Sequence, residues 1–142
     1  MGPPPRAPIG LVLARTARVV STAFDRSLAR AGGSASAWQV LVLVRSGQWG
    51  AQTEMAKAMG ITGATLTHHL NALEDKGLVR RWREASNRRV QQVALTDAGE
   101  ALFDRLRAVA LEHDERLRAL LSDEEVAQLE VLLEKVRSGV ES

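Results

Sequence analysis

The segment that most constrains the fold is residues 52–78, where two helical patterns follow each other with only a short turn between them. In the second pattern Leu66, Leu70 and Leu73 recur at i, i+4 and i+7. At 3.6 residues per turn they form one apolar stripe. That stripe must face a core, so the opposite side of the helix is expected to face outward.

A sharp turn is predicted between the two helices. Met55, Ala56 and Met59 mark the buried side of the first, shorter helix. Gly60 can supply the positive φ that ends it, and Thr62 stands at the N-cap position of the second. The segment is therefore interpreted as a helix-turn-helix whose second helix would enter the major groove of DNA. A plain helical hairpin inside an all-α core is the alternative.

The outward face of the second helix is small and polar. Its hydroxyl, imidazole and amide groups can hydrogen-bond, which suits a groove of DNA. The candidate DNA contacts on this helix and at its N-cap are Thr62, Ala64, Thr65, Thr67, His68 and Asn71.

A basic β-hairpin is predicted next. Residues 80–83 and 90–95 have strand-like composition, and residues 84–87 are typical of a turn. Residues 79–90 hold five arginines and one acid, a local charge of 5 − 1 = +4. We interpret this hairpin as a wing that enters a narrow minor groove, with Arg83, Arg88 and Arg89 as candidate contacts. The alternative is a solvated edge hairpin whose arginines only prevent edge pairing.

The order of these pieces resembles the MarR-type winged-helix regulators. The resemblance is carried by the sequences LEDKGLVRR at 73–81, NRR at 87–89 and VALTDAG at 93–99, and it extends from about residue 9 to 136. Two positions depart from the family pattern. Asn87 replaces the usual aspartate that often orients the wing arginines. Ala51 stands where a threonine or serine often caps the first helix of the motif, a loss of about 1 kcal/mol.

Further helical patterns flank the motif. Residues 9–30 follow a helical period that ends at Gly32 and Gly33, and a shorter helix is expected over residues 36–44. A long helix is expected from Thr96 to about residue 121, with its apolar stripe starting at Ala98. Residues 122–125 have the S-x-x-E form of a capping box, which begins a last helix.

The apolar stripes of the first and the last two helices are too long for a winged domain of this size to bury alone. They are expected to form an intertwined two-fold dimer, which the resemblance also implies. A two-fold dimer predicts a pseudo-palindromic operator with half-sites about one helical turn apart.

The chain is thus predicted to be a mainly α protein with a small β-hairpin wing. Residues 1–8 hold all four prolines and are expected to form a flexible arm, with contact to a partner subunit as the alternative. Residues 9–142 would form a single domain, with the winged helix-turn-helix at 36–96 and N- and C-terminal dimerisation helices at 9–30 and 97–138.

Charge is distributed unevenly along the sequence. Residues 1–96 carry 13 basic and 5 acidic side chains, 13 − 5 = +8, whereas residues 97–142 carry 6 and 12, 6 − 12 = −6. A basic front with an acidic rear orients a protein on double-stranded DNA.

Composition argues against several other classes of protein. Cysteine is absent, so disulfides and thiolate-metal sites are excluded. With no run of about 18 apolar residues and no secretory pattern, the expected location is the cytoplasm and no membrane contact is expected. There is no G-x-S-x-G, P-loop or G-x-G-x-x-G, so no enzyme activity and no cofactor are predicted.

The three histidines do not indicate a metal site. His68 and His69 are adjacent and point about 100° apart on a helix, so they cannot easily share one metal ion. His69 is expected to pack or to line a pocket. His113 has acidic neighbours, but a satisfied interface histidine is the preferred interpretation, and no metal is predicted.

The resemblance implies a small aromatic or phenolic acid as effector, held between the dimerisation helices and the winged domain. Arg15 is the candidate cation and Trp38 the candidate stacking face, with His69 lining the same pocket. The alternative is that Trp38 belongs to the core and Arg15 to an intersubunit salt bridge.

The preferred function is a sequence-specific regulator, usually a repressor in the family that the chain resembles. The alternative is a winged-helix dimer that serves as a protein-interaction or non-specific nucleic-acid scaffold.

Overall fold

The computed structural model describes residues 6–47 and 52–142 of the chain. The first five residues of the predicted arm, the loop residues 48–50 and the departure at Ala51 lie outside these ranges. Six helices and two strands follow in the order α1 (Ile9–Arg30), α2 (Ala35–Ser46), α3 (Gln52–Met59), α4 (Gly63–Asp75), β1 (Val79–Glu84), β2 (Asn87–Leu95), α5 (Asp97–Ala119) and α6 (Asp123–Glu141). The prediction of a mainly α fold with one β-hairpin is confirmed.

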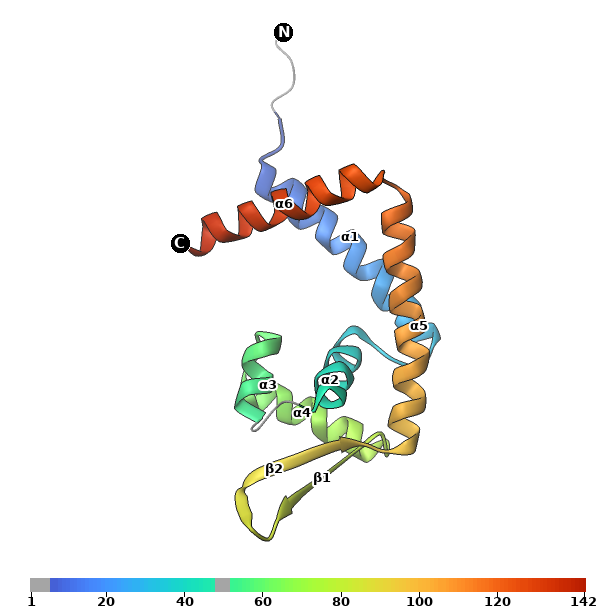
Figure 1. Ribbon diagram of the computed structural model, residues 1–142, viewed down its shortest axis with the longest axis vertical. Coiled ribbons are helices and arrows are strands. Elements are labelled where there is room, and N and C mark those ends of the chain that lie inside the picture. The colour runs from blue at the N-terminus through green and yellow to red at the C-terminus, as the bar shows by residue number, and fades with distance from the viewer. Residues whose placement is uncertain (1–5, 48–51) are drawn as a thin grey trace.

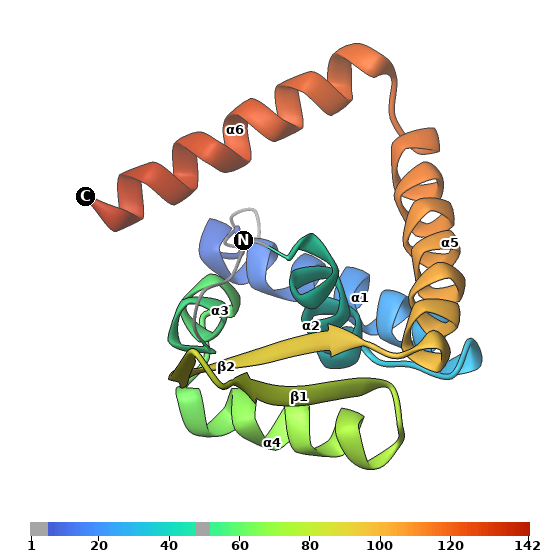
Figure 2. The same cartoon turned by 60° about the horizontal axis from the view of Figure 1, so that its bottom comes forward.

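The helix-turn-helix and the hairpin form one body, from which the long helices extend. In Figure 1, α2, α3 and α4 gather above the hairpin, while α1 and α5 meet near the C-terminal end of α1 and diverge from there. After α5 the chain turns sharply, and α6 projects back over the winged body without packing on it, as Figure 2 also shows.

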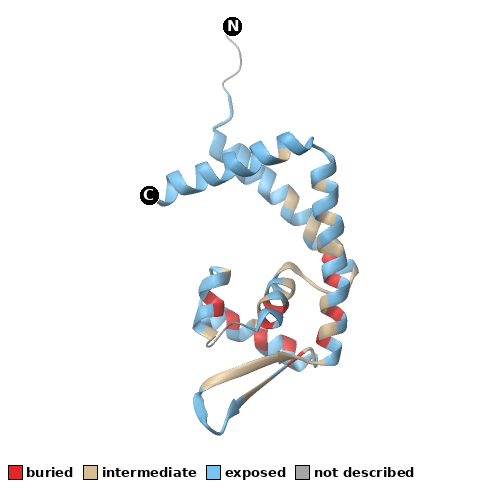
Figure 3. Ribbon diagram, in the orientation of Figure 1, coloured by how far each residue is buried: buried red, intermediate tan, exposed pale blue. Residues whose placement is uncertain are grey.

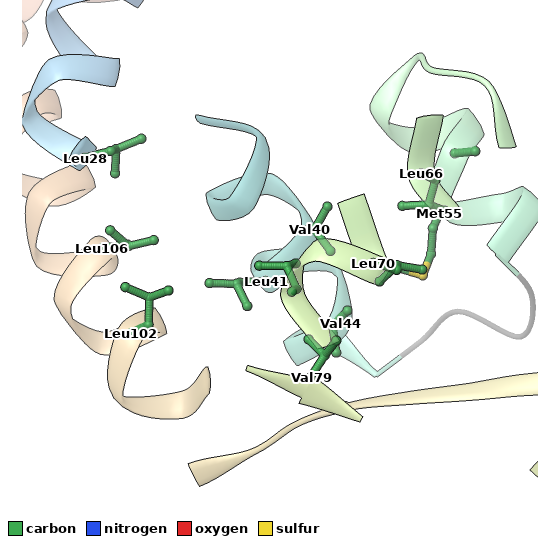
Figure 4. Packing of buried hydrophobic residues seen from close by; sticks show 12 residues of the cluster. Leu28, Val40, Leu41, Val44, Met55, Leu66, Leu70, Val79, Leu102 and Leu106 are labelled. Carbon is green, nitrogen blue, oxygen red and sulfur yellow. The ribbon is translucent and has the colours of Figure 1, made fainter. Parts of the chain in front are cut away.

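The core lies where α4 meets α2, α3 and the base of β1. All three residues of the leucine stripe are buried, as their spacing predicted. Leu28 of α1 and Leu102 and Leu106 of α5 extend this core toward the long helices (Figure 4). Buried residues are confined to these junctions, and α6 has none (Figure 3).

Side-chain caps fix where four of the helices begin. The hydroxyl of Thr62 accepts from the backbone N–H of Thr65 at 3.1 Å, so the predicted cap of α4 is confirmed. The capping box at Ser122 and Glu125 is present as well. Ser34 caps α2 in the same way, which is why that helix begins earlier than predicted.

The hairpin differs in detail from its prediction. Val79 pairs with Leu95 and Arg83 with Gln91, but the register breaks there, and Glu84 pairs with Asn87. The turn is therefore only Ala85 and Ser86, and residues 88–90 bulge out of the ladder. The predicted four-residue turn and the strand start at residue 90 are both wrong.

The stripe of α5 is shifted by one residue at its start. Ala98 is exposed, and Gly99 is buried in its place against the carbonyl of Leu78. Leu102 and Leu106 continue the buried side as predicted, whereas the far end of the helix emerges from the body. Within the described ranges, no helix is both long and apolar enough to span a membrane.

Candidate nucleic-acid interface

All the predicted DNA contacts are exposed. Those on α4 lie outside the buried leucine stripe, and the arginines belong to β1 and β2, whose tip is exposed (Figure 3). The exposed residues are Thr62, Ala64, Thr65, Thr67, His68, Asn71, Arg83, Arg88 and Arg89. Their side chains are therefore accessible to a ligand outside the chain.

At the start of α4, Thr62 and Thr65 bind each other as well as the helix backbone. Their hydroxyl oxygens lie 2.9 Å apart, and Thr62 also accepts from the N–H of Thr65. One hydroxyl hydrogen of the pair remains for an acceptor outside the chain. The cap thus fixes the orientation of two candidate contacts.

The wing tip is organised by its own backbone. The guanidinium of Arg83 donates to the carbonyl of Arg88 at 2.9 Å, and Asn87 Oδ1 accepts from the N–H of Arg89 at 3.3 Å. An amide oxygen thus holds the backbone of the bulge at the position where the family usually has aspartate. Within the described ranges, the guanidinium groups of Arg88 and Arg89 have no acidic partner, so their charge is available to phosphates.

Two further arginines of the hairpin are engaged within the chain. Arg80 lies over the ring of Trp82 at 4.6 Å, and the indole N–H of Trp82 donates to Glu84 at 2.9 Å. Arg81 turns toward α4, where its terminal nitrogen donates to Asn71 Oδ1 and, at 3.0 Å, to Glu74 Oε1. The local charge of +4 therefore overstates the charge that the wing presents.

The contact between Arg81 and Glu74 was missed by the count of charges. Arg81 follows the buried Val79 by two positions, and side chains of a strand alternate, so both face the same side. That alternation was the available signal. The hydrogen bond and charge of Arg81 hold the pKa of the Glu74 carboxyl below its usual value, which keeps the carboxyl ionised.

The candidate effector residues do not share one cavity within a single chain. Trp38 stacks on Phe103 of α5 with ring centroids 5.5 Å apart, and lines a cavity of about 260 Å³ beside Val42 and Met59. That cavity includes neither Arg15, which is exposed on α1, nor His69, which is half-buried on α4. The cavity beside Trp38 lies between α2 and α3 of the winged body, and its lining includes no residue of α1 or α5.

The remaining histidine packs within the chain. His113 of α5 stacks on Phe24 of α1 with ring centroids 4.8 Å apart and nearly parallel planes. His68 and His69 have ring centroids 6.0 Å apart and tilted planes. Among the described residues no cluster of three or more His, Asp or Glu side chains is placed to hold a metal ion.

Comparison with known proteins agrees with this arrangement. The model of the MarR family matches residues 34–90, from the start of α2 into β2. The transcriptional repressor CouR, solved bound to a 23-mer DNA duplex, is 30% identical over 92% of this chain and 92% of its own, with a TM-score of 0.81.

Two more solved structures are similar over nearly their whole length. A MarR variant from E. coli, complexed with operator DNA, is 26% identical over 91% of this chain and 93% of its own, with a TM-score of 0.80. MepR from S. aureus, in complex with DNA, shares the fold at 24% identity over 94% and 99%, with a TM-score of 0.84. This chain belongs to the MarR family of winged helix-turn-helix transcriptional regulators.

Proposed function

We propose that this protein is a repressor that binds a specific pseudo-palindromic operator as a homodimer. The observation that carries the proposal is the exposure of both the hydrogen-bonding side chains of α4 and the wing arginines, of which Arg88 and Arg89 have no acidic partner among the described residues. In this proposal, the exposed residues of α4 would contact base edges in the major groove, and Arg83, Arg88 and Arg89 would contact the adjacent minor groove or its phosphates.

The apolar surfaces of α1 and α6 support the dimer. Large apolar side chains on both helices are exposed, although the helices meet at a cavity of about 290 Å³. Exposed apolar surface of this extent is typical of a subunit interface. A two-fold dimer would present two recognition helices to two half-sites.

Repression is proposed by analogy with relatives. CouR is described as a transcriptional repressor and was solved on a DNA duplex, and the E. coli MarR variant was solved on operator DNA. These complexes favour a regulator over the alternative of a protein-interaction scaffold.

The proposal is tested by fluorescence anisotropy with the DNA upstream of the protein's own gene and with random duplex at several salt concentrations. The upstream duplex is expected to bind about 10³-fold more tightly or better. Arg89→Ala should weaken both duplexes alike and reduce the salt slope by about one unit. His68→Ala should instead relax the preference at particular bases. Equal binding of the two duplexes by the unmodified protein would refute the proposal.

A ligand response is proposed as well, with an aromatic or phenolic acid as the effector class. CouR from Rhodococcus jostii RHA1 was solved bound to p-coumaroyl-CoA, which carries a phenolic acyl group. In this chain, the apolar cavity beside Trp38 offers an aromatic face for such a group. Arg15 and His69 are proposed to complete the pocket in the dimer.

A ligand releases DNA only if it binds the DNA-incompetent conformation more tightly. Salicylate is therefore expected to raise the melting temperature and to weaken operator binding. Arg15→Ala should keep operator affinity and lose this response, while the control Arg18→Ala, on the same exposed helix, keeps both. No effect of salicylate on the unmodified protein would rule out this pocket.

A further inference from the structure

The contacts between Glu74 and Arg81 join the recognition helix to the wing in two ways. Glu74 Oε1 accepts from the guanidinium of Arg81 at 3.0 Å, and Glu74 Oε2 accepts from the backbone N–H of Arg81 at 3.2 Å. Asn71, one turn earlier on α4, accepts from the same guanidinium nitrogen. One carboxylate of α4 therefore holds both the main chain and the side chain of β1.

This contact lies near the root of the wing, whereas the free arginines lie at its tip. The hairpin begins at Val79, which is buried, and every residue from Arg83 to Arg89 is exposed. A strand rises about 3.3 Å per residue, so the turn lies roughly 13 Å beyond Arg81. Over that length a rotation of about 10° at the root moves the tip by about 2 Å.

Arg81 is poorly placed to contact DNA itself. Its side chain is 13% exposed, against 40% for Glu74, and the carboxylate neutralises its charge. Its Nε–H is buried with no acceptor among the described residues. A largely covered guanidinium whose charge is neutralised contributes little to phosphate binding, so Arg81 is expected to act by holding the wing in place.

We propose that Glu74 and Arg81 are a positioning pair that fixes the wing relative to α4, so that the recognition face and the wing arginines meet DNA as one preorganised surface. The proposal rests on the proposed function, because it concerns how the same surface binds DNA. Neither residue contacts a base or phosphate. Each acts through Arg88 and Arg89, whose placement determines whether they reach the minor groove.

Removing one negative charge from α4 changes DNA affinity in opposite directions under a positioning role and under simple electrostatics. Glu74→Gln and Asp75→Asn each remove one negative charge from neighbouring positions of α4, and Asp75 is exposed with no hydrogen bond or ion pair among the described residues. Electrostatics alone predicts that both variants bind DNA more tightly. Positioning predicts that Glu74→Gln weakens operator binding about tenfold, while Asp75→Asn binds as tightly as the unmodified protein or slightly better.

A second comparison separates positioning from a general loss of stability. In a background with Arg88→Ala and Arg89→Ala the wing lacks the two guanidinium groups through which the pair is proposed to act. Glu74→Gln is then expected to cost less than about twofold, since the two effects act through one contact. A variant that merely destabilises the fold would lose the same factor in both backgrounds. Arg81→Met, which removes the buried Nε–H, should behave like Glu74→Gln.

The decisive measurement without DNA is the backbone order of the wing. In ¹⁵N relaxation of the full-length protein, the amides of residues 84–90 are expected to lose order in Glu74→Gln and to keep it in Asp75→Asn. If the unmodified protein shows no operator preference, the proposed function fails, and this relaxation result still supports or overturns the positioning pair. Unchanged wing order in Glu74→Gln, or affinity equal to or tighter than that of Asp75→Asn, would overturn it.

Discussion

Replacing Gly99 with alanine is expected to lower the free energy of unfolding by about 3 kcal/mol, because the new methyl group has no space. A Cβ at this position would lie 1.9 Å from the carbonyl oxygen of Leu78 and 3.4 Å from the Cβ of Leu95. The carbonyl cannot easily move away, since it accepts from the N–H of Thr96 at 3.1 Å. At about 3 °C per kcal/mol for a chain of this size, the melting temperature should fall by roughly 10 °C.

The matched control is Gly139→Ala in α6, where nothing lies within 4 Å of the added Cβ. Both substitutions bring the same gain in helix propensity, so their difference isolates the steric clash. Gly139→Ala is expected to stabilise the protein by about 0.5–1 kcal/mol. Thermal denaturation followed by circular dichroism measures both variants. A Gly99→Ala protein that melts with the unmodified one would mean that α5 does not approach Leu78 this closely.

The contacts around Gly99 explain why the VALTDAG segment at 93–99 ends in glycine. The N-cap Thr96 binds Gly99 N at 3.1 Å and donates through its hydroxyl to the carbonyl of Gly77. The start of α5 is thereby bound to the end of α4 beside the root of the wing. The VALTDAG motif could be recognised in the sequence. The contact that requires glycine could not, because it joins Gly99 to the carbonyl of Leu78, about twenty residues earlier.

Local signals predicted the recognition helix well. The leucine stripe, the positive φ of Gly60 and the cap at Thr62 all depend on residues within one or two turns of each other. Such features are visible in a sequence because helical periodicity and capping are short-range rules. The exposed face of α4 followed from the same periodicity.

The positions of the two strands could be predicted from the sequence, but the pairing register between them could not. Composition located both strands, whereas the break between Arg83 and Glu84 depends on how residues 88–90 leave the ladder. No Asn-Gly or Asp-Gly pair marks the turn at Ala85 and Ser86, so the strongest short-range hairpin signal is missing.

Side-chain partners across the fold were the least predictable part. Counting charge assigned five arginines to the wing, yet Arg81 bonds to α4 and Arg80 lies over Trp82. The stacking of Trp38 on Phe103 likewise joins α2 to α5, far apart in sequence. Composition gives the number of charges and rings, but only tertiary packing determines what they contact.

The apolar surface of α6 is expected to be covered by a second protomer. No residue of this helix is buried, although it carries six large apolar side chains that are at least one-third exposed. Several face α1 across the cavity between the two helices. Its lining residues are Ile9, Gly10, Val12, Leu13, Thr16, Leu129, Leu132, Leu133 and Val136. A single helix pair does not close this surface, so we propose that a second protomer covers it.

Leu129→Glu together with Leu133→Glu is therefore expected to convert the homodimer into a monomer. The two positions are one turn apart on the cavity side of α6, and two carboxylates buried there without partners would strongly oppose association. Glutamate is a good helix former, so α6 itself should stay folded. Ala127→Glu introduces the same side chain on the same helix, but about 160° around it from Leu129 and outside the cavity, and should leave the dimer intact.

Sedimentation velocity measures the mass of each variant, and anisotropy with the operator measures the consequence for binding. A monomer presents one recognition helix instead of two and loses the effective concentration that links the half-sites. Operator affinity should then fall about a hundredfold or more, while affinity for a single half-site changes little. If the Leu129→Glu, Leu133→Glu variant remains a dimer of the same mass as the Ala127→Glu control, the interface does not lie on this face of α6. The two-fold arrangement proposed for the operator complex would then have to be built from other surfaces.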